Sequence, residues 1–403
     1  MSGPKDIKAS KLKTKRAQGA GKATPQKGGN TDKAAPEKSE TKLDITCSPG
    51  IVRWLIRNKC SLAFTSYKTG KLFLIGVMKT GALSFHQRNF DRAMGLWTDP
   101  ASQRLYLGTL HQFWRFENIL LPGNIADDTF DKCYVPRQSF VTGNVLAHDI
   151  ALDAGGRIIF VNTAYSCLAV TDPVHSFRPL WKPHFISELA VEDRCHLNGL
   201  AMEDGHPRYV TAVSRTDAAA GWREHRSDGG LIMDVTTDTI LTEGLSMPHS
   251  PRLYRNDLYV LDAGRGHLCQ IDRKTGAVDR IAFCPGFLRG LAFHNNNAIV
   301  GLSLPRDNSF AGLDLDAALT SRDAEPWCGL QIINLQSRET VEWLRIQGEV
   351  DELYDVAVLP NVQCPMALDF VEQGIQRAIS FERDFAEMTY PPTADADVAL
   401  ATG

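Results

Sequence analysis

One short pattern recurs along this chain: a polar cluster that contains His or Arg runs directly into an apolar stretch typical of a β-strand. It occurs at residues 148–153, 194–202, 249–253 and 289–293. Between these sites, further short apolar stretches alternate with turn residues. A strand pattern that returns about every 50 residues predicts a β-propeller, in which small sheets surround a central channel and the polar clusters meet at its mouth.

The fold is therefore expected to be all-β with six blades. The apolar stretches at 61–77, separated by a Lys-Thr-Gly-Lys turn, predict a hairpin. If this hairpin formed most of another sheet there would be seven blades; otherwise it is the natural partner for the last blade in closing the ring. A short helix is expected within 45–60, and the interval 305–329 is interpreted as an insertion. The inner strands are predicted to start near residues 92, 148, 196, 249, 289 and 351.

The ends of the chain differ from this central part. Residues 1–42 carry eleven basic and four acidic residues, for a net charge of +7, whereas the whole chain has a net charge of -3. Because this segment has almost no large apolar residue, it is expected to be disordered. It either attaches the protein to an anionic partner, such as nucleic acid, a membrane surface or an acidic protein, or acts as a solubilising tail. The predicted division is a disordered tail at 1–44, a propeller at 45–370, and a C-terminal helix with a loose tail at 371–403.

The composition of the chain indicates the cellular compartment in which the protein is expected. No run of about 18 apolar residues occurs, so no membrane span is predicted, and the basic tail lacks the apolar core of a secretion signal. The nine Cys include no CxxC pair, which favours reduced structural thiols and a cytoplasmic protein.

Three histidines occupy nearly equivalent positions in consecutive repeats: His148, His196 and His249. Neutral imidazole nitrogens suit Zn²⁺, Fe²⁺ or Cu²⁺, and three protein ligands leave coordination positions open for water or substrate. The sequence therefore predicts a divalent transition-metal site at the channel mouth, with Asp149 or Asp355 as a carboxylate that orients a ligand histidine. The alternative is that each histidine is a surface residue or a hydrogen-bonded structural one.

Other polar residues are expected at about the same level of the channel as the three histidines. Arg289 and Arg194 can clamp a carboxylate or phosphate with the planar guanidinium fork, or they can pair with an acidic residue of the channel. Tyr354 can act as a proton donor or base, or pack with its hydroxyl satisfied. Asn198 is expected to help orient a substrate. Cys195 is adjacent to His196, and adjacent strand residues point to opposite faces, which disfavours a Cys–His nucleophile.

A series of motifs occurs in order along the chain. They are Tyr134 to Arg137, His148 to Ala151, Glu192 to Ala201, Pro248 to Arg252, Leu261 to Gly266 and Pro285 to Phe293. With them the chain resembles, over about residues 50–365, a mainly bacterial family catalogued as domain of unknown function 4915. The resemblance implies a propeller-like fold with the His-bearing motifs as its signature, and it brings no assigned activity.

The functional hypothesis is a metal-dependent enzyme with hydrolase or lyase chemistry on a small polar or anionic molecule or a modified peptide. Six-bladed propellers with central metals include lactonases of the gluconolactonase type and the lyase that releases amidated peptides, which combines central His, Arg and Tyr. This likeness is one of fold. The alternative is a non-catalytic propeller whose faces bind a protein or glycan partner.

Overall fold

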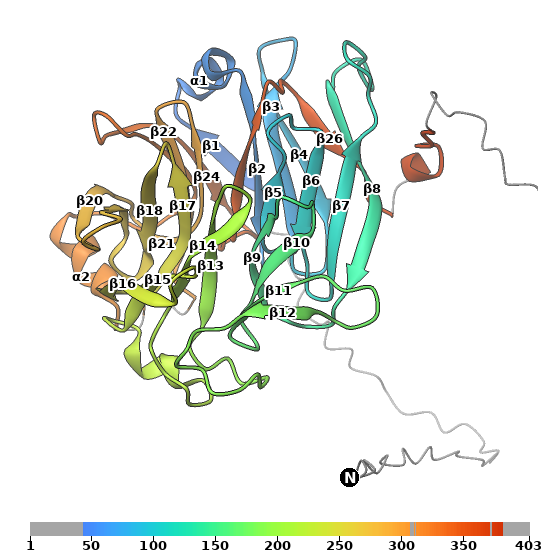
Figure 1. Ribbon diagram of the computed structural model, residues 1–403. Coiled ribbons are helices and arrows are strands. Elements are labelled where there is room, and N and C mark those ends of the chain that lie inside the picture. Colours follow the sequence, from blue (N-terminus) through green and yellow to red (C-terminus); the bar gives the residue numbers. More distant parts are fainter. Residues whose placement is uncertain (1–42, 307–309, 311, 371–372, 382–403) are drawn as a thin grey trace, which may run out of the picture. The chain divides into compact units, whose positions relative to one another are not determined.

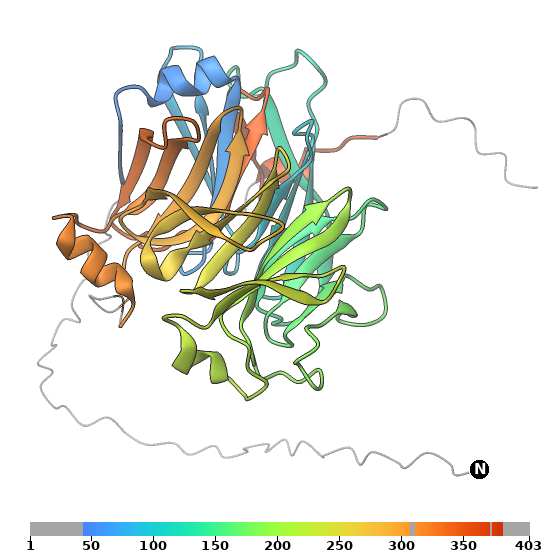
Figure 2. The ribbon, with the colours of Figure 1, turned by 60° about the vertical axis from the view of Figure 1, so that its left-hand side comes forward.

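The computed structural model describes residues 43–306, 310, 312–370 and 373–381. Within this part of the chain the strands form six sheets arranged around a central axis (Figure 1, Figure 2). The first strand of each sheet contacts the first strands of the two neighbouring sheets, so these strands line the axis. The protein is a six-bladed β-propeller, which confirms the predicted fold.

Each blade has four strands. From the inner to the outer strand, blade 1 consists of β5 (Leu96–Thr98), β6 (Arg104–Gly108), β7 (Gln112–Asn118) and β8 (Lys132–Val141), and blade 2 of β9 (Ala147–Leu152), β10 (Ile158–Asn162), β11 (Cys167–Val170) and β12 (Arg178–Trp181). Blade 3 consists of β13 (Leu197–Glu203), β14 (His206–Ala212), β15 (Gly230–Asp234) and β16 (Thr239–Leu245), and blade 4 of β17 (Pro248–Tyr254), β18 (Asp257–Asp262), β19 (His267–Ile271) and β20 (Val278–Phe283). Blade 5 consists of β21 (Phe287–His294), β22 (Asn297–Ser303), β23 (Cys328–Asn334) and β24 (Thr340–Gln347), and blade 6 of β25 (Val356–Pro360), β2 (Cys60–Ser66), β3 (Lys71–Val77) and β4 (Leu83–Asn89).

Blade 6 closes the ring with strands from opposite ends of the described chain. Its inner strand β25 pairs antiparallel with β2, so that Ala357 faces Ala63. The predicted hairpin is β2–β3, and its role is ring closure rather than a seventh blade. Two further strands extend other blades at their outer edges: β1 (Asp44–Cys47) pairs with β24, and β26 (Pro365–Ala367) pairs parallel with β8.

The blades pack face to face, and this explains the composition of their strands. Every residue of β2 and β3 is buried, because both faces of the sheet are covered by neighbouring blades. Phe64 stacks on Phe73 with ring centroids 4.9 Å apart, and both belong to one apolar cluster with Ile332 and Leu344 of blade 5. The core therefore consists of apolar layers between adjacent blades.

In the described part of the chain, two α-helices lie outside the sheets. The helix α1 (Ile51–Asn58) buries Ile51, Trp54 and Leu55 against blades 5 and 6, as its spacing predicts. The helix α2 (Asp314–Ser321) lies in the interval between β22 and β23 that was interpreted as an insertion. No helix in the described ranges is long and apolar enough to cross a membrane.

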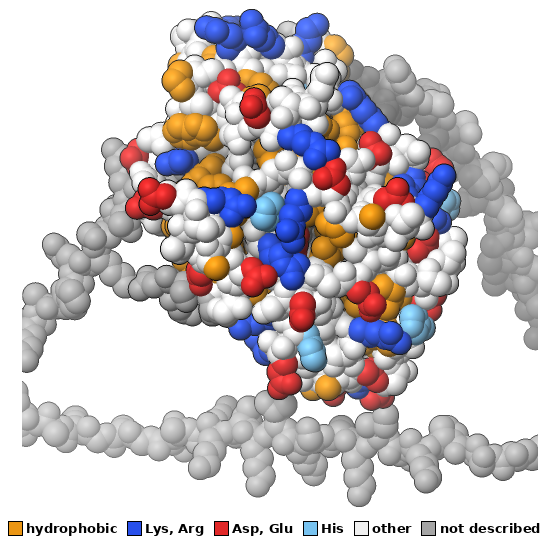
Figure 3. All heavy atoms as spheres, turned by 90° about the vertical axis from the view of Figure 1, so that its left-hand side faces the viewer, with side chains coloured by type: hydrophobic (Ala, Val, Ile, Leu, Met, Phe, Trp, Pro, Cys, Tyr) orange, Lys and Arg blue, Asp and Glu red, His pale blue; other side chains and the backbone are white. Residues whose placement is uncertain are grey.

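The predicted basic tail at 1–44 lies outside the described residues except for Leu43 and Asp44, and Asp44 begins β1. Of the C-terminal region, the structure describes a single 3-10 turn at Gln373–Gln376 and the residues up to 381. On the face of the molecule in Figure 3, acidic and basic side chains are interspersed.

Candidate metal centre

The three histidines are brought together at one mouth of the channel. His148 lies in β9, His249 lies in β17, and His196 immediately precedes β13. One ring nitrogen from each lies within 4.8 Å of the other two. The predicted triad is therefore a cluster in space, although 48 and 53 residues separate its members along the chain.

Irregular backbone at the start of the inner strands places these side chains. Leu146, His196 and Met247 all have left-handed φ values, of 49°, 50° and 45°. The pairing of β17 with β18 also shifts register after His249. Bulges and left-handed residues of this kind re-aim side chains at the rims of sheets, and here they turn imidazoles toward the axis.

Each imidazole is held through its Nδ1 atom. The Nδ1 of His148 lies 3.0 Å from the carbonyl oxygen of Leu146, and that of His249 lies 2.9 Å from the carbonyl oxygen of Met247. A carbonyl only accepts, so Nδ1 carries the proton in both rings. Nε2 then keeps its lone pair, the tautomer that a metal ligand requires.

His196 has a carboxylate partner instead of a carbonyl. Its Nδ1 lies 3.0 and 3.1 Å from the two carboxylate oxygens of Asp193. The same carboxylate accepts a 3.0 Å hydrogen bond from Nε1 of Trp222. The sequence pointed to Asp149 or Asp355 for this orienting role. Both carboxylates bind elsewhere, and Asp193 takes the position.

The Nε2 atoms are left without protein partners. In the described part of the chain none of the three makes a hydrogen bond, and that of His249 is fully buried. Burial, together with the neighbouring imidazoles and Arg289, lowers the pKa of His148 and of His249 well below the usual value. Both rings are therefore neutral near pH 7, as metal ligation requires.

The spacing suits one ion after a small adjustment. Nitrogens bound to the same tetrahedral Zn²⁺ at about 2.0–2.1 Å lie about 3.4 Å apart. The largest separation here is 4.8 Å or less, so each ring needs to move by less than about 1 Å. The cluster can hold a metal with three protein ligands, which leaves positions open toward the pocket.

That pocket has a volume of about 440 Å³ and combines apolar and charged walls. Aromatic rings surround the histidines: Trp222 lies 4.2 Å from His196 between centroids, and Tyr354 lies 5.4 Å from His148. Burial raises the pKa of the Tyr354 hydroxyl well above its usual range, so this group is protonated at neutral pH and can donate.

Arg289 lines the same pocket, as the sequence predicted, and it has a partner that the sequence analysis did not single out. Its Nη1 donates a 2.8 Å hydrogen bond to Oε1 of Glu352, and Nη2 of Arg306 donates to the same oxygen at 2.7 Å. Glu352 is two residues before Tyr354, in the stretch that was predicted to begin the last inner strand, where alternation would have placed both side chains on one face; in the structure β25 begins only at Val356.

Arg194 and Asn198 lie elsewhere. The guanidinium of Arg194 is surrounded by the carboxylates of Glu188, Glu192 and Asp217 at 2.7–3.1 Å, so it serves as the centre of a structural ion cluster and does not line the pocket. Asn198 lies at a register shift of β13, and its Oδ1 accepts a 2.7 Å hydrogen bond from Thr211. Its side chain therefore faces β14 instead of the pocket.

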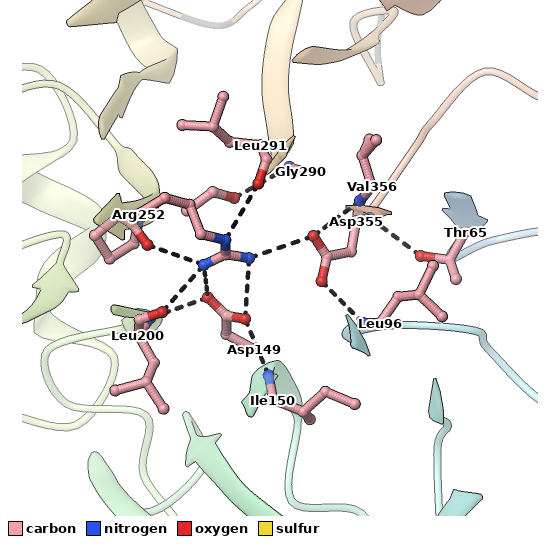
Figure 4. Close-up of polar contacts among 12 residues, drawn as sticks. Thr65, Leu96, Asp149, Ile150, Leu200, Arg252, Gly290, Leu291, Asp355 and Val356 are labelled. Carbon is pink, nitrogen blue, oxygen red and sulfur yellow. Dashed lines mark hydrogen bonds and ion pairs between the residues drawn. The ribbon is translucent and has the colours of Figure 1, made fainter. Parts of the chain in front are cut away.

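Arg252, Asp149 and Asp355 form a charged cluster between the inner strands, which we call the hub (Figure 4). Asp149 directly follows His148, and Asp355 directly follows Tyr354. Arg252 binds Asp149 through Nη1 and Nη2 at 2.6 and 3.2 Å, and it approaches Asp355 at 3.5 Å. The sequence analysis did not include Arg252 among the site residues.

The hub also bonds to the backbone of the inner strands. Arg252 donates to the carbonyl oxygens of Leu200 in β13 and Leu291 in β21 at 3.1 and 3.2 Å. Asp355 accepts a 2.8 Å hydrogen bond from the amide of Leu96 in β5. With Asp149 on β9, Arg252 on β17 and Asp355 at the start of β25, three side chains connect all six blades. Arg252 also lines a second hollow among the inner strands.

Comparison with known proteins identifies the family. No curated protein matches this chain. A crystal structure titled as a nidogen/laminin complex aligns with 76% of this chain and 100% of that chain, at 13% identity and a TM-score of 0.47. The family model described as "Domain of unknown function (DUF4915)" matches residues 49–368, which is most of the chain. The protein therefore belongs to the DUF4915 family.

Proposed function

We propose that this propeller is a metal-dependent enzyme whose centre is a divalent transition ion, Zn²⁺, Fe²⁺ or Cu²⁺, bound by Nε2 of His148, His196 and His249. One observation carries the proposal: all three imidazoles are anchored through Nδ1, and one ring nitrogen of each lies within 4.8 Å of the other two, beside a pocket that His148 and His196 line. Buried polar atoms are usually hydrogen-bonded, and an imidazole held through one nitrogen with the other left unpartnered is the arrangement of a metal ligand.

The reaction is hydrolysis or elimination on a small polar or anionic molecule. A bound ion supplies a Lewis acid that polarises a carbonyl or lowers the pKa of a water. The remaining groups belong to the chain itself. Arg289 lies against the ring of Tyr354, with its Cζ 5.1 Å from the centroid, and is placed to stabilise negative charge that develops on the substrate. The protonated Tyr354 hydroxyl is a suitable donor to a leaving group.

The nine cysteines support the cytoplasm as the compartment in this proposal. None of the nine forms a disulfide, and eight of them are buried. Burial raises the pKa of Cys60 and of Cys195 to about 12, so these thiols are unreactive structural groups.

The test is elemental mass spectrometry of untagged, full-length protein after metal supplementation and desalting. We expect about one equivalent of a transition metal in the wild type and its loss in His148→Ala, His196→Ala and His249→Ala. The matched control is His175→Ala, because His175 is exposed on the loop between β11 and β12; this variant should retain the metal. Circular dichroism establishes that each variant is folded.

Absence of metal from folded wild-type protein after supplementation would refute the metal centre. Metal that remains in all three alanine variants would place it at another site and would refute it equally. Metal bound at the triad, followed by no turnover of esters, lactones or amidated peptides, would reject the enzymatic part of the proposal for those substrate classes.

A further inference from the structure

Arg289 and Glu352 form an ion pair in which one polar atom of each side chain has no hydrogen-bond partner. The two side chains are 10% and 5% exposed and are joined by one hydrogen bond, from Nη1 to Oε1. Nε of Arg289 and Oε2 of Glu352 are both buried without a partner. Buried polar groups are nearly always satisfied, so this pair presents one unmet donor and one unmet acceptor in a pocket wall.

The protein itself prevents the pair from closing into the usual two-bond fork. Oε1 of Glu352 accepts from both Arg289 and Arg306, which fixes the carboxylate with its second oxygen turned away from them. The Arg306 side chain is 58% exposed, whereas that of Glu352 is 5% exposed. Rotation of the Arg306 side chain into solvent would therefore uncover the Glu352 carboxylate, which stays paired with Arg289.

The unmet groups define the chemistry of the ligand. Oε2 of Glu352 needs a hydrogen-bond donor, and Nε of Arg289 needs an acceptor. A carboxylate or phosphate placed here would accept from Arg289 but would meet the negative charge of Glu352. A hydroxyl group donates and accepts at once, so neighbouring hydroxyls on one molecule satisfy both groups.

The rim of the pocket is suited to a negative charge. Arg223 is exposed there, with its Cζ 4.6 Å from the ring centroid of Trp222, and it forms no ion pair with a described residue. The pocket lining contains four arginines, Arg223, Arg226, Arg289 and Arg306, and two carboxylates, Asp193 and Glu352, so positive charge is in excess. Guanidinium groups at such a position recognise carboxylate and phosphate oxygens.

We propose that the substrate is a polyhydroxylated anion, a sugar acid or a sugar phosphate, whose hydroxyls bind Glu352 and Arg289 and whose charged end lies at Arg223. The inference rests on the proposed function, because it assigns a substrate class to the same pocket. It adds that recognition of the hydroxyls is separate from metal binding, since neither Arg289 nor Glu352 belongs to the histidine cluster.

Isothermal titration calorimetry on metal-loaded, desalted, full-length protein tests this directly. The probes are gluconate, glucose 6-phosphate, hexanoate, which has the carboxylate without hydroxyls, and sorbitol, which has the hydroxyls without a charge. We expect gluconate or glucose 6-phosphate to bind at least tenfold more tightly than hexanoate and sorbitol, and the tighter of the two identifies the anionic group. Equal binding of gluconate and hexanoate, or no binding of either hydroxylated anion, would overturn the proposal.

Two variants test the named side chains. Glu352→Gln replaces an obligate acceptor by an amide, and Arg289→Lys keeps the charge but removes Nε; each should weaken binding of the preferred hydroxylated anion about tenfold and leave metal content unchanged. The matched control, Glu349→Gln, alters an exposed carboxylate that pairs with Lys71, and it should bind like wild type. Unchanged binding in both pocket variants would refute the assignment.

The same samples separate the two proposals. Metal content is measured before each titration, and the titrations are repeated on metal-free protein. If no metal is bound but hydroxylated anions are still preferred, the proposed function is refuted and the substrate class is not. Bound metal without that preference would remove only the substrate class.

Discussion

Replacement of Arg252 should destabilise the whole propeller, because the hub connects all six blades. Replacing it with alanine removes the hydrogen bonds to Asp149, Leu200 and Leu291 and leaves two buried carboxylates that face each other without a cation. Removing one partner of a buried ion pair costs about 3–5 kcal/mol. For roughly 300 ordered residues with an unfolding entropy of about 2.1 cal/mol/K each, this corresponds to a Tm lower by about 5–8 °C.

The assay is thermal and urea unfolding, monitored by tryptophan fluorescence, of metal-free protein. The triple variant Arg252→Met, Asp149→Asn and Asp355→Asn removes all the charges and should recover most of the loss, because the cost arises from unpaired carboxylates. Arg338→Ala breaks an exposed ion pair with Asp279 and should leave the midpoint unchanged. A midpoint for Arg252→Ala within 1 °C of wild type, or a triple variant no more stable than the single one, would contradict the role of the hub.

Three other predictions concern single residues. Asp193→Asn should weaken metal binding about 10- to 100-fold, measured by competition with a chromogenic chelator, because it removes the carboxylate that orients His196. Burial raises the pKa of Asp355 to about 7, against the lowering effect of Arg252; the folded chain therefore holds this proton more tightly, and its contribution to stability is present at pH 4 and lost as the pH rises to 7. In urea titrations, Asp355→Asn should gain more than about 1 kcal/mol relative to wild type between pH 5 and pH 7.5. Gly290→Ala should lower stability by about 2 kcal/mol or more, because Gly290 has a φ of 79° and an added Cβ would lie 2.7 Å from the amide nitrogen of Val356.

Each of these has a clear contrary result. Wild-type chelator competition for Asp193→Asn would remove that carboxylate from the metal site. A stability difference between wild type and Asp355→Asn that is constant with pH would show that the carboxyl has the same pKa in the folded and unfolded chain. Unfolding of Gly290→Ala at the wild-type midpoint would show that the strand shifts freely at that bulge.

The repeat pattern predicts the ring well because a propeller places equivalent residues at equivalent depth. The six inner strands, the closing hairpin and the insertion were predicted from the alternation of apolar stretches and turns, although β5 and β25 begin four and five residues later than expected, at Leu96 and Val356. His148, His196 and His249 could be grouped for the same reason. The position of a residue along its strand is determined by the local sequence, so a repeated local sequence reveals which residues lie at the same level of the channel.

The interaction partner of each side chain could not be predicted in the same way, because it depends on the direction in which the side chain points across the ring. Arg194 and Asn198 have the right depth, but Arg194 is taken by nearby loop carboxylates and Asn198 is turned aside by a register shift in β13. Arg252 lies three residues after His249, beyond another register shift, so alternation counted from the histidine does not place it on the axis. A one-residue slip reverses the face of a side chain, and such slips occur where the pocket is built.

The way in which blade 6 is assembled makes the pocket a product of ring closure. The strand β25 and the residues just before it bring Glu352, Tyr354 and Asp355 to the axis, and β25 is held there by β2, nearly 300 residues earlier in the chain. A nascent chain that has completed blades 2 to 5 already contains all three histidines, yet it lacks one wall of the pocket and one carboxylate of the hub. The complete pocket should therefore form only when synthesis has passed residue 360, so that an open ring on the ribosome still lacks it.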